Sequence, residues 1–433
     1  MLEAFHSSNR SALWASLAAK LNSFAKESRL VQRVSKKFSP EKFLLAMLDA
    51  TSTGRASFNQ LVATIGFNEP ELNTSPQALN KRVNRTECGV EGFLVRCLSY
   101  ICQHRSHPSG TVADDRPFER IVVEDSTSLR LPKSNVEEFP GHGNAVGETA
   151  GCKIDLAFDL LVGSIVHSEL FIATEQDKTI GIGLLDHIRS NDLVLRDMGY
   201  FGVENFLAIE TLGAFWLSRL PLNVDVHTKD GVALEKILAG CRGDTVDLGV
   251  TLTAKRHSAR LVAVRASKQE ANKRRRERRA EAKRRGRKAD KKALIRDGWH
   301  LMVTNVARKK QSVAKLVAIY SQRWLIEMAF RAWKQAGNMA KALNRNSGPQ
   351  HLKGLVLAGM IAMVLGLKIG LSLARGKPGM RYSLEKIFDY ILARLVALRK
   401  LTDLGEIKPD PRHLQGQKRK RLSLNCKLIE LLG

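Results

Sequence analysis

Two aspartates and one glutamate stand where phosphoryl-transfer chemistry could use them. Asp125 follows the run I-V-V-E, and Asp197 follows a second run, L-V-L-R. In α/β folds reactive carboxylates lie at the C-terminal ends of buried strands, although strand-end aspartates are also common turn formers. With Glu327 on a later helix, the three acids could hold two Mg²⁺ or Mn²⁺ ions, which would stabilise the attacking and leaving oxygens of an in-line displacement.

Glu327 lies in the stretch Y-S-Q-R-W-L-I-E-M-A-F-R-A-W-K, which predicts a surface helix. Its polar residues include Tyr320, Arg323, Glu327 and Lys334. At about 100° per residue these four fall within about 60° of one another, which predicts a single polar stripe along the helix. Arg331 stands four residues after Glu327, so an ordinary helix salt bridge is the alternative for this glutamate.

No other common catalytic pattern competes with these acids: the chain has no Ser/His/Asp order, no histidine cluster and no Walker loop. The cysteines show no C-x-x-C pair; they are Cys88, Cys97, Cys102, Cys152, Cys241 and Cys426. Cys97 and Cys102, with His104 nearby, could form half of a zinc site. The second half is missing, so buried reduced thiols are the favoured interpretation.

The net charge indicates a polyanionic partner. The 433 residues include 70 Lys and Arg against 43 Asp and Glu, which gives +27 at pH 7 and a pI near 10.1. A charge of this size favours nucleic acid over the alternatives, anionic membranes or ribosomes. The apolar content of 44% is ordinary for a globular protein, and the length predicts two to four domains.

No segment predicts export or membrane insertion. Glu3, His6 and Arg10 interrupt any apolar signal region, and the most apolar segment, Gly354–Leu367, is too short to cross a bilayer. We therefore expect a buried helix at this segment and a soluble, cytoplasmic protein associated with the nucleoid.

Residues 1–115 are expected to form a helical DNA-binding region. Ser75 is a suitable N-cap with Pro76 at the first helical position, and a preceding helix joined by a short polar turn suggests a helix-turn-helix. The exposed face of the second helix would carry Gln77, Asn80, Lys81 and Arg85, with Lys81 and Arg85 as DNA contacts. A helical hairpin with one polar side is the alternative.

The next segment, residues 116–220, predicts the first part of an α/β core. Three strands, a helix, a strand, a helix and a strand follow one another, which is the order of the ribonuclease-H-like fold. The second and third strands form a hairpin around a Gly-Ser turn, and the first helix is expected near Lys178–Ile188.

A β-rich insertion, residues 221–306, is expected to interrupt this core. Between 268 and 292 it carries fourteen basic residues against four acids, which predicts a solvated basic helix suited to phosphate contact without sequence readout. Residues 307–345 return to the core with the helix of Glu327. Residues 346–433 are expected to be helical and to end in a basic tail, G-Q-K-R-K-R.

These motifs resemble the bacterial insertion-sequence DDE transposases of the insertion sequence four type, which carry a YREK signature. The pattern Y-x2-R-x3-E-x6-K is present as Tyr320, Arg323, Glu327 and Lys334. The segments V-V-E-D-S-T-S-L-R-L-P and L-V-L-R-D-M-G-Y-F resemble the contexts of the two aspartates in that group. The resemblance spans residues 30 to 375 and implies a ribonuclease-H-like catalytic core, divalent metal and cut-and-paste DNA chemistry.

The resemblance also implies roles for single residues. The metal ligands would be Asp125, Asp197 and Glu327, and the phosphate contacts Tyr320, Arg323 and Lys334. Members of the group are thought to form a DNA hairpin with a flipped base, which stacks on an aromatic in the last strand of the insertion. Trp299 occupies that place, and Trp324 is a second candidate; hydrophobic core is the alternative for both.

The resemblance therefore implies a DNA transposase that acts on double-stranded DNA, both transposon ends and target, as a homodimer in a synaptic complex. An inactive DNA-binding repressor or domesticated protein of the same fold is the alternative. A nuclease of the same fold that cuts without joining strands is a third possibility.

Overall fold

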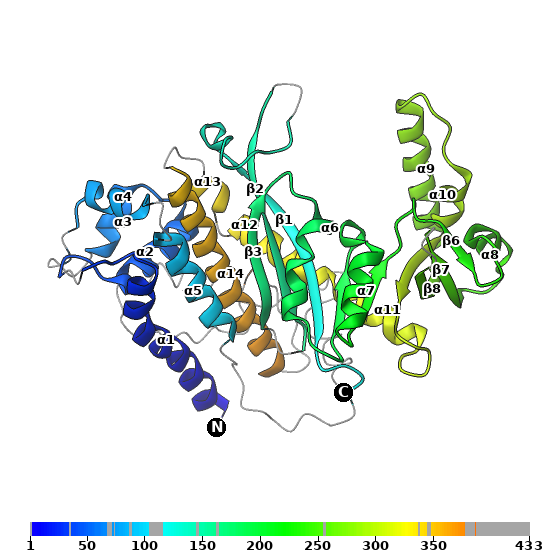
Figure 1. Ribbon diagram of the computed structural model, residues 1–433, viewed down its shortest axis with the longest axis horizontal. Helices are drawn as coiled ribbons and strands as arrows, with labels where there is room; N and C mark the ends of the chain where they lie inside the picture. Colours follow the sequence, from blue (N-terminus) through cyan, green and yellow to red (C-terminus); the bar gives the residue numbers. More distant parts are fainter. Residues whose placement is uncertain are drawn as a thin grey trace. The chain divides into compact units, whose positions relative to one another are not determined.

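The computed structural model describes residues 2–33, 36–66, 72, 74–85, 89–103, 116–143, 147–161, 164–253, 257–336, 338–343, 348–376 and 386. It divides into two compact units, and each is described by itself (Figure 1). Unit 1 comprises Met1–Val112, Ser126–Glu175 and Trp324–Gly433, and unit 2 comprises Ala113–Asp125 and Gln176–Arg323.

Unit 1 is built mainly from helices. These are α1 (Leu2–Glu27), α2 (Pro40–Thr53), α3 (Phe58–Ile65), α4 (Pro76–Val83), α5 (Gly89–Gln103), α12 (Trp324–Ala336), α13 (Met339–Leu343) and α14 (Pro349–Gly376). α14 packs against α2 and α5 (Figure 1). A Cβ at Gly354 would lie 3.1 Å from the side chains of both Met47 and Val90, so glycine permits the close approach of the three helices.

The predicted buried helix at Gly354–Leu367 is confirmed for its side chains through Val364, but the helix is longer than expected. α14 runs for 28 residues. Its window Pro349–Gly366 is long and apolar enough to cross a membrane by length and composition, yet 78% of that window is buried inside the protein. Burial against α2 and α5 accounts for the apolar sequence.

The predicted helix start at Ser75 and Pro76 is confirmed by α4. The Ser75 hydroxyl accepts a hydrogen bond from the Ala78 amide, and Pro76 opens the helix. Lys81 is exposed, whereas Arg85 lies beyond the helix end at Val83. α3 ends at Ile65, and most of the turn expected between α3 and α4, residues 67–71 and 73, lies outside the described residues.

The strands of unit 1 form the predicted hairpin. β2 (Ala150–Asp159) pairs antiparallel with β3 (Ile165–Ile172), and every residue of β2 is buried. The strand order in this part of the sheet is β3-β2-β1, where β1 is Ile121–Leu131 and enters unit 1 at Ser126. A short 3-10 helix, Lys133–Asn135, follows β1.

The strands of unit 2 follow in the order β1-β4-β5-β9-β8-β7-β6 (Figure 1). They are β4 (Leu193–Arg196), β5 (Phe215–Arg219), β6 (Val226–Thr228), β7 (Thr245–Leu252), β8 (His257–Arg265) and β9 (Trp299–Thr304). β4 lies between β1 and β5 and pairs parallel with both. The other neighbours, in the order β5-β9-β8-β7-β6, pair antiparallel. The apolar runs of the sequence therefore become the buried central strands, as their composition predicts.

The helices of unit 2 range from four residues in α6 to 17 in α9. They are α6 (Asp177–Ile180), α7 (Val203–Thr211), α8 (Leu234–Gly240), α9 (Lys268–Arg284), α10 (Lys291–Arg296) and α11 (Val313–Ser321), with 3-10 helices at Gly183–His187 and Met198–Tyr200. The helix expected over Lys178–Ile188 is thus wrong: only α6 and a 3-10 turn form. Gly181 and Gly183 disfavour a continuous helix. A Cβ at Gly181 would also lie 2.8 Å from Tyr200.

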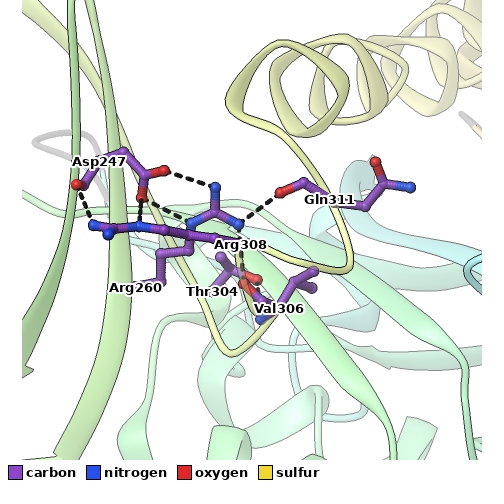
Figure 2. A network of polar contacts seen from close by, with 6 residues as sticks. All are labelled: Asp247, Arg260, Thr304, Val306, Arg308 and Gln311. Carbon is purple, nitrogen blue, oxygen red and sulfur yellow. Dashed lines mark hydrogen bonds and ion pairs between the residues drawn. The ribbon is translucent and has the colours of Figure 1, made fainter.

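Arg260 on β8 ties the loop between β9 and α11 to the sheet (Figure 2). Its Nη1 donates to the carbonyls of Val306, at 3.1 Å, and Gln311, at 2.8 Å. Its Nε and Nη2 bind the carboxylate of Asp247 on β7 at 2.9 Å each. Arg308 from the loop adds a third contact, with Nε 3.1 Å from Asp247 Oδ1. The loop that leads into α11 is therefore held by the buried guanidinium of Arg260 and by the exposed Arg308, both bound to Asp247.

The arginines also act on the ionisation of Asp247. Burial alone raises the pKa of this carboxyl, but hydrogen bonds and charge from Arg260 and Arg308 outweigh it and leave the pKa below the ordinary aspartate value. The carboxylate therefore stays charged at neutral pH and keeps both arginines in place.

We expect Arg260→Ala to lower the free energy of unfolding by about 3 kcal/mol, because it removes the cation from a largely buried network and leaves two carbonyls without their donor. The matched variant is Arg308→Ala, whose side chain is 61% exposed. It should lose less than about 1 kcal/mol. Urea titrations followed by circular dichroism measure both, and equal losses would contradict the role given to Arg260.

Candidate active site

The register of two parallel strands brings Asp125 and Asp197 to the same level. Ile121 pairs with Leu193, and Val123 pairs with Leu195. The constant offset of 72 residues continues to Glu124 and Arg196, whose side chains form an ion pair. Continued by one more residue, the same offset would set Asp125 beside Asp197, which directly follows the end of β4. Because side chains alternate along extended chains, both carboxylates lie on the same face, and neighbouring strands lie about 4.8 Å apart.

Asp125 does not end its strand, contrary to the sequence-based expectation. β1 continues to Leu131. Beyond Asp125 the chain alternates, with Leu129 and Leu131 buried and Arg130 exposed, which is the pattern of a half-buried strand. β4, by contrast, ends at Arg196, directly before Asp197. β1 therefore loses its partner β4 near Asp125, although β1 itself continues to Leu131.

A buried ion pair lies one residue before the two aspartates. Arg196 Nε donates to Glu124 Oε2, and the two side chains are 1% and 0% exposed. Arg196 Nη2 also donates to the Gly181 carbonyl. The sequence analysis did not predict this ion pair. Charged residues at the ends of otherwise apolar runs, Glu124 after I-V-V and Arg196 after L-V-L, were the available signal.

Two residues of the candidate signature meet the aspartates inside unit 2. The Tyr320 hydroxyl lies 3.1 Å from the Arg196 carbonyl and 3.4 Å from Asp197 Oδ1. Arg323 Nη1 lies 3.1 Å from Asp125 Oδ2, and the Arg323 side chain is only 10% exposed. Burial, reinforced by the charge of Asp197, raises the pKa of Tyr320, so its hydroxyl keeps its proton and donates.

The signature residues do not lie on one continuous helix, which corrects the single polar stripe expected from the sequence. Tyr320 is in α11, which ends at Ser321, and α12 begins at Trp324. The amides of Gln322 and Arg323 donate hydrogen bonds to the carbonyls three residues earlier, those of Ile319 and Tyr320. These tighter bonds turn the backbone between the two helices, so the angular spacing of an ideal α-helix does not apply.

Glu327 and Lys334 belong to α12 in unit 1. Glu327 is half-buried in the first turn. Lys334 Nζ donates to the Ser128 carbonyl on β1 at 2.7 Å, and burial lowers the pKa of Lys334. The apolar face of α12, which includes Ile326, Ala329 and Trp333, is buried.

The aspartates of unit 2 have the chemistry that a hard divalent cation requires. Carboxylate oxygens are the ligands that Mg²⁺ and Mn²⁺ prefer, and the Asp125 side chain is 18% exposed, so the site is accessible. Among the residues that the structure describes, no group of three or more His, Cys, Asp or Glu side chains is placed to hold a metal ion. Asp125 and Asp197 are in unit 2, whereas Glu327 is in unit 1.

The two candidate tryptophans differ in their surroundings. Trp299 opens β9 and is 4% exposed, with the Arg265 guanidinium 4.3 Å from its ring centroid. In this arrangement the guanidinium covers the indole, so a flipped DNA base cannot stack on it. Trp324 opens α12 in unit 1 and is partly exposed.

The cysteines give no zinc site among the residues described. Cys97 and Cys152 are buried free thiols, and burial raises the pKa of each to about 12. Cys102 and Cys241 are partly exposed. His104, Cys88, Cys426 and the basic tail lie outside the described residues.

The family comparison decides how this geometry is read. Residues 116–361, more than half of the chain, match the model of the transposase DDE domain. The chain belongs to this family. The DDE domain contains every candidate residue from Asp125 to Lys334, whereas Lys81 and Arg85 precede it.

Relatives of the DDE transposase chain are named as transposases of insertion sequences. The transposase for insertion sequence element IS231C of Bacillus thuringiensis subsp. berliner is 27% identical over 72% of this chain and 70% of its own length. That for IS231D of B. thuringiensis subsp. finitimus is 28% identical over the same shares. The transposase for IS1151 of Clostridium perfringens is 23% identical, again over 72% and 70%. Family and relatives together support transposable elements and DNA recombination as the setting of this protein.

Proposed function

We propose that this DDE transposase cuts DNA at the ends of its insertion sequence and joins those ends to target DNA. The observation that carries the proposal is the contact of Arg323 with Asp125 and of Tyr320 with Asp197, beside the parallel pairing of β1 with β4. Two carboxylates on one face of a sheet, with a cation and a proton donor beside them, suit a site that receives phosphates.

Asp125, Asp197 and Glu327 are the proposed metal ligands. When bound, two Mg²⁺ or Mn²⁺ ions would activate water and neutralise charge on the attacking and leaving oxygens. Arg323 would bind a phosphate oxygen through its planar guanidinium, and Lys334 would supply a compact positive charge. Tyr320 would donate its hydroxyl proton as a hydrogen bond to a phosphate oxygen or to Asp197 Oδ1.

The finer parts of the proposal rest on the YREK signature. We assign the chain to the insertion sequence four type, with cut-and-paste transposition through a DNA hairpin. Trp299 and Trp324 are the proposed packing sites for a flipped base. For Trp299 this requires the Arg265 guanidinium to move from the indole, since the ring is otherwise covered.

The ribonuclease-H-like core is proposed from the strand order. β3-β2-β1 in unit 1 and β1-β4-β5 in unit 2 support it, as does the change from parallel to antiparallel pairing after β5. The proposed domains remain 1–115, 116–220, 221–306, 307–345 and 346–433, with 221–306 as the insertion. The proposed assembly is a homodimer on two transposon ends, in the cytoplasm on the nucleoid.

A single incubation tests the function. Purified protein, Mg²⁺ and a labelled duplex that carries the element's terminal inverted repeat are resolved on a denaturing gel. Nicks and hairpins at the repeat boundary, followed by strand-transfer product with target DNA, are the expected result. Binding without cleavage would favour the inactive repressor, and cleavage without strand transfer would favour an ordinary nuclease.

We expect the double variant Lys81→Ala/Arg85→Ala to weaken binding to the terminal repeat by about 10-fold or more at moderate salt, if these exposed cations contact DNA. Electrophoretic mobility shifts with repeat-bearing and scrambled duplexes measure the effect. The matched control is Lys20→Ala/Lys26→Ala, which removes two cations from α1. End-specific binding equal to that of the wild type would remove α4 from the DNA-reading role.

A further inference from the structure

The basic helix α9 has two faces with different partners. Its inner face is attached to the following segment of unit 2. Arg278 binds Asp297 with Nε and Nη2, both at 2.7 Å, and the Asp297 side chain is 4% exposed. Arg275 Nε donates to the Leu294 carbonyl at 3.0 Å, and Arg274 Nη1 donates to the Trp299 carbonyl at 3.2 Å. These arginines are structural and are not available to a partner.

The ionisation of Arg278 agrees with this structural role. Its hydrogen bond to Asp297 raises the pKa of the guanidinium, against the opposing effect of burial. The sequence shows fourteen basic residues in this block without distinguishing them, whereas the structure sorts them into fixed and outward-facing groups.

The outer face carries a stripe of cations. Arg276, Arg279 and Lys283 are exposed and stand three and four residues apart, so their side chains emerge on one side of the helix. Within the part of the chain that the structure describes, none of the three forms an ion pair. Arg284 and Arg285, by contrast, both pair with Glu281, and Lys273 lies 3.9 Å from Glu277.

Such a stripe is unfavourable for an isolated helix. Like charges at spacings of three and four residues repel each other, and a face that served only for solubility would mix the two signs. From Arg276 to Lys283 the stripe rises by seven residue steps, about 10 Å along the axis at 1.5 Å per residue. Figure 1 shows α9 as one straight helix above α10 and the strand β8, so the cations are presented on a regular element.

We propose that the outer face of α9, defined as Arg276, Arg279 and Lys283, binds the phosphate backbone of duplex DNA without reading its sequence. The proposal rests on the proposed function, which makes DNA the substrate. Duplex DNA carries one negative charge per 1.7 Å of axis, so several phosphates lie within reach of a stripe of this length. Because the inner face is already fixed, the backbone of the helix loses little conformational entropy on binding.

The test measures how DNA affinity changes with salt. The probe is a 40-base-pair duplex of arbitrary sequence, titrated with the full-length protein between 50 and 200 mM KCl. Each lost phosphate contact reduces the slope of log affinity against log salt by about 0.9. The variant Arg276→Ala/Arg279→Ala/Lys283→Ala should therefore have a slope about 2 to 3 smaller. Over the fourfold salt range, wild-type affinity should fall roughly 40-fold more than that of the variant.

The matched control removes the same charge from another part of unit 2. Lys229, Lys236 and Arg242 are exposed, and Lys229→Ala/Lys236→Ala/Arg242→Ala changes the net charge equally. This control should keep the wild-type slope. The proposal is overturned if the α9 variant keeps the wild-type slope, or if the control variant shows the same reduction of the slope. It is also overturned if the α9 substitutions weaken binding to phosphatidylserine vesicles but leave DNA binding unchanged.

The two proposals fail in different ways. If the wild-type protein nicks a repeat-bearing duplex but the α9 variant keeps the slope, the inference on α9 is wrong and the proposed function stands. If the slope falls as expected but no cleavage or joining occurs in Mg²⁺, the α9 surface is supported and the proposed chemistry is wrong.

Discussion

Asp125→Asn and Asp197→Asn should each reduce Mg²⁺-dependent cleavage of a repeat-bearing duplex by about a thousandfold or more. Asparagine has nearly the same shape but lacks the negative charge that a divalent cation requires. A bound metal contributes several kcal/mol to the stabilisation of the transition state, and each 1.4 kcal/mol is a factor of ten in rate. Glu327→Gln should have a similar effect. The rate of nicking under single-turnover conditions is the measurement, with EDTA as the metal-free reference.

The control for this prediction is Asp230→Asn, which makes the same change at an exposed position of unit 2. It should nick at the wild-type rate, and all variants should retain DNA binding. A ligand role has a second signature: Asp125→Cys should recover part of its activity with Mn²⁺ or Zn²⁺, because a thiolate prefers softer cations than Mg²⁺. Wild-type nicking by any of the three carboxylate variants would contradict the acidic triad.

The second large effect concerns the buried ion pair beside the aspartates. Arg196→Met should lower the free energy of unfolding by about 3 to 5 kcal/mol, since it leaves the fully buried Glu124 carboxylate without its cation. The double variant Glu124→Leu/Arg196→Met should recover much of this loss, because a matched apolar pair avoids the cost of burying charge. Urea titrations at pH 7 give these differences.

Lys178→Met is the reference for the ion-pair experiment. Lys178 and Glu204 form an exposed pair in the same unit, at 3.7 Å with side chains 52% and 63% exposed. This variant should lose less than about 1 kcal/mol. A loss at Arg196→Met no larger than at Lys178→Met would show that Glu124 and Arg196 do not stabilise the strands.

The same ion pair has a consequence for activity. Glu124 and Arg196 immediately precede Asp125 and Asp197, so the pair holds the two reactive positions level across β1 and β4. The folded double variant should therefore nick more slowly than the wild type, with a smaller effect on DNA binding. A wild-type rate in a stable double variant would show that the register of the strands is sufficient without the pair.

Strands and caps were predictable because their signals are local. L-V-L-R became β4, and Ser75 caps α4. Elements that depend on distant partners were not predictable in detail. The strand β1 continues past Asp125, and the expected helix from Tyr320 to Lys334 is broken after Ser321. No local pattern in the sequence marks where one pairing partner of a strand ends.

The amino-acid sequence by itself determined the excess of positive charge, the apolar strands, and the acids and cations of the candidate site, because these depend on residue type and spacing. Only the tertiary structure decided which of them meet. The fold brought Tyr320 to Asp197 and Arg323 to Asp125, and the ion pair with Asp297 separated Arg278 from the outward cations of α9. Charge and periodicity act between near neighbours in the chain, whereas register and ion pairing join residues that are far apart in it.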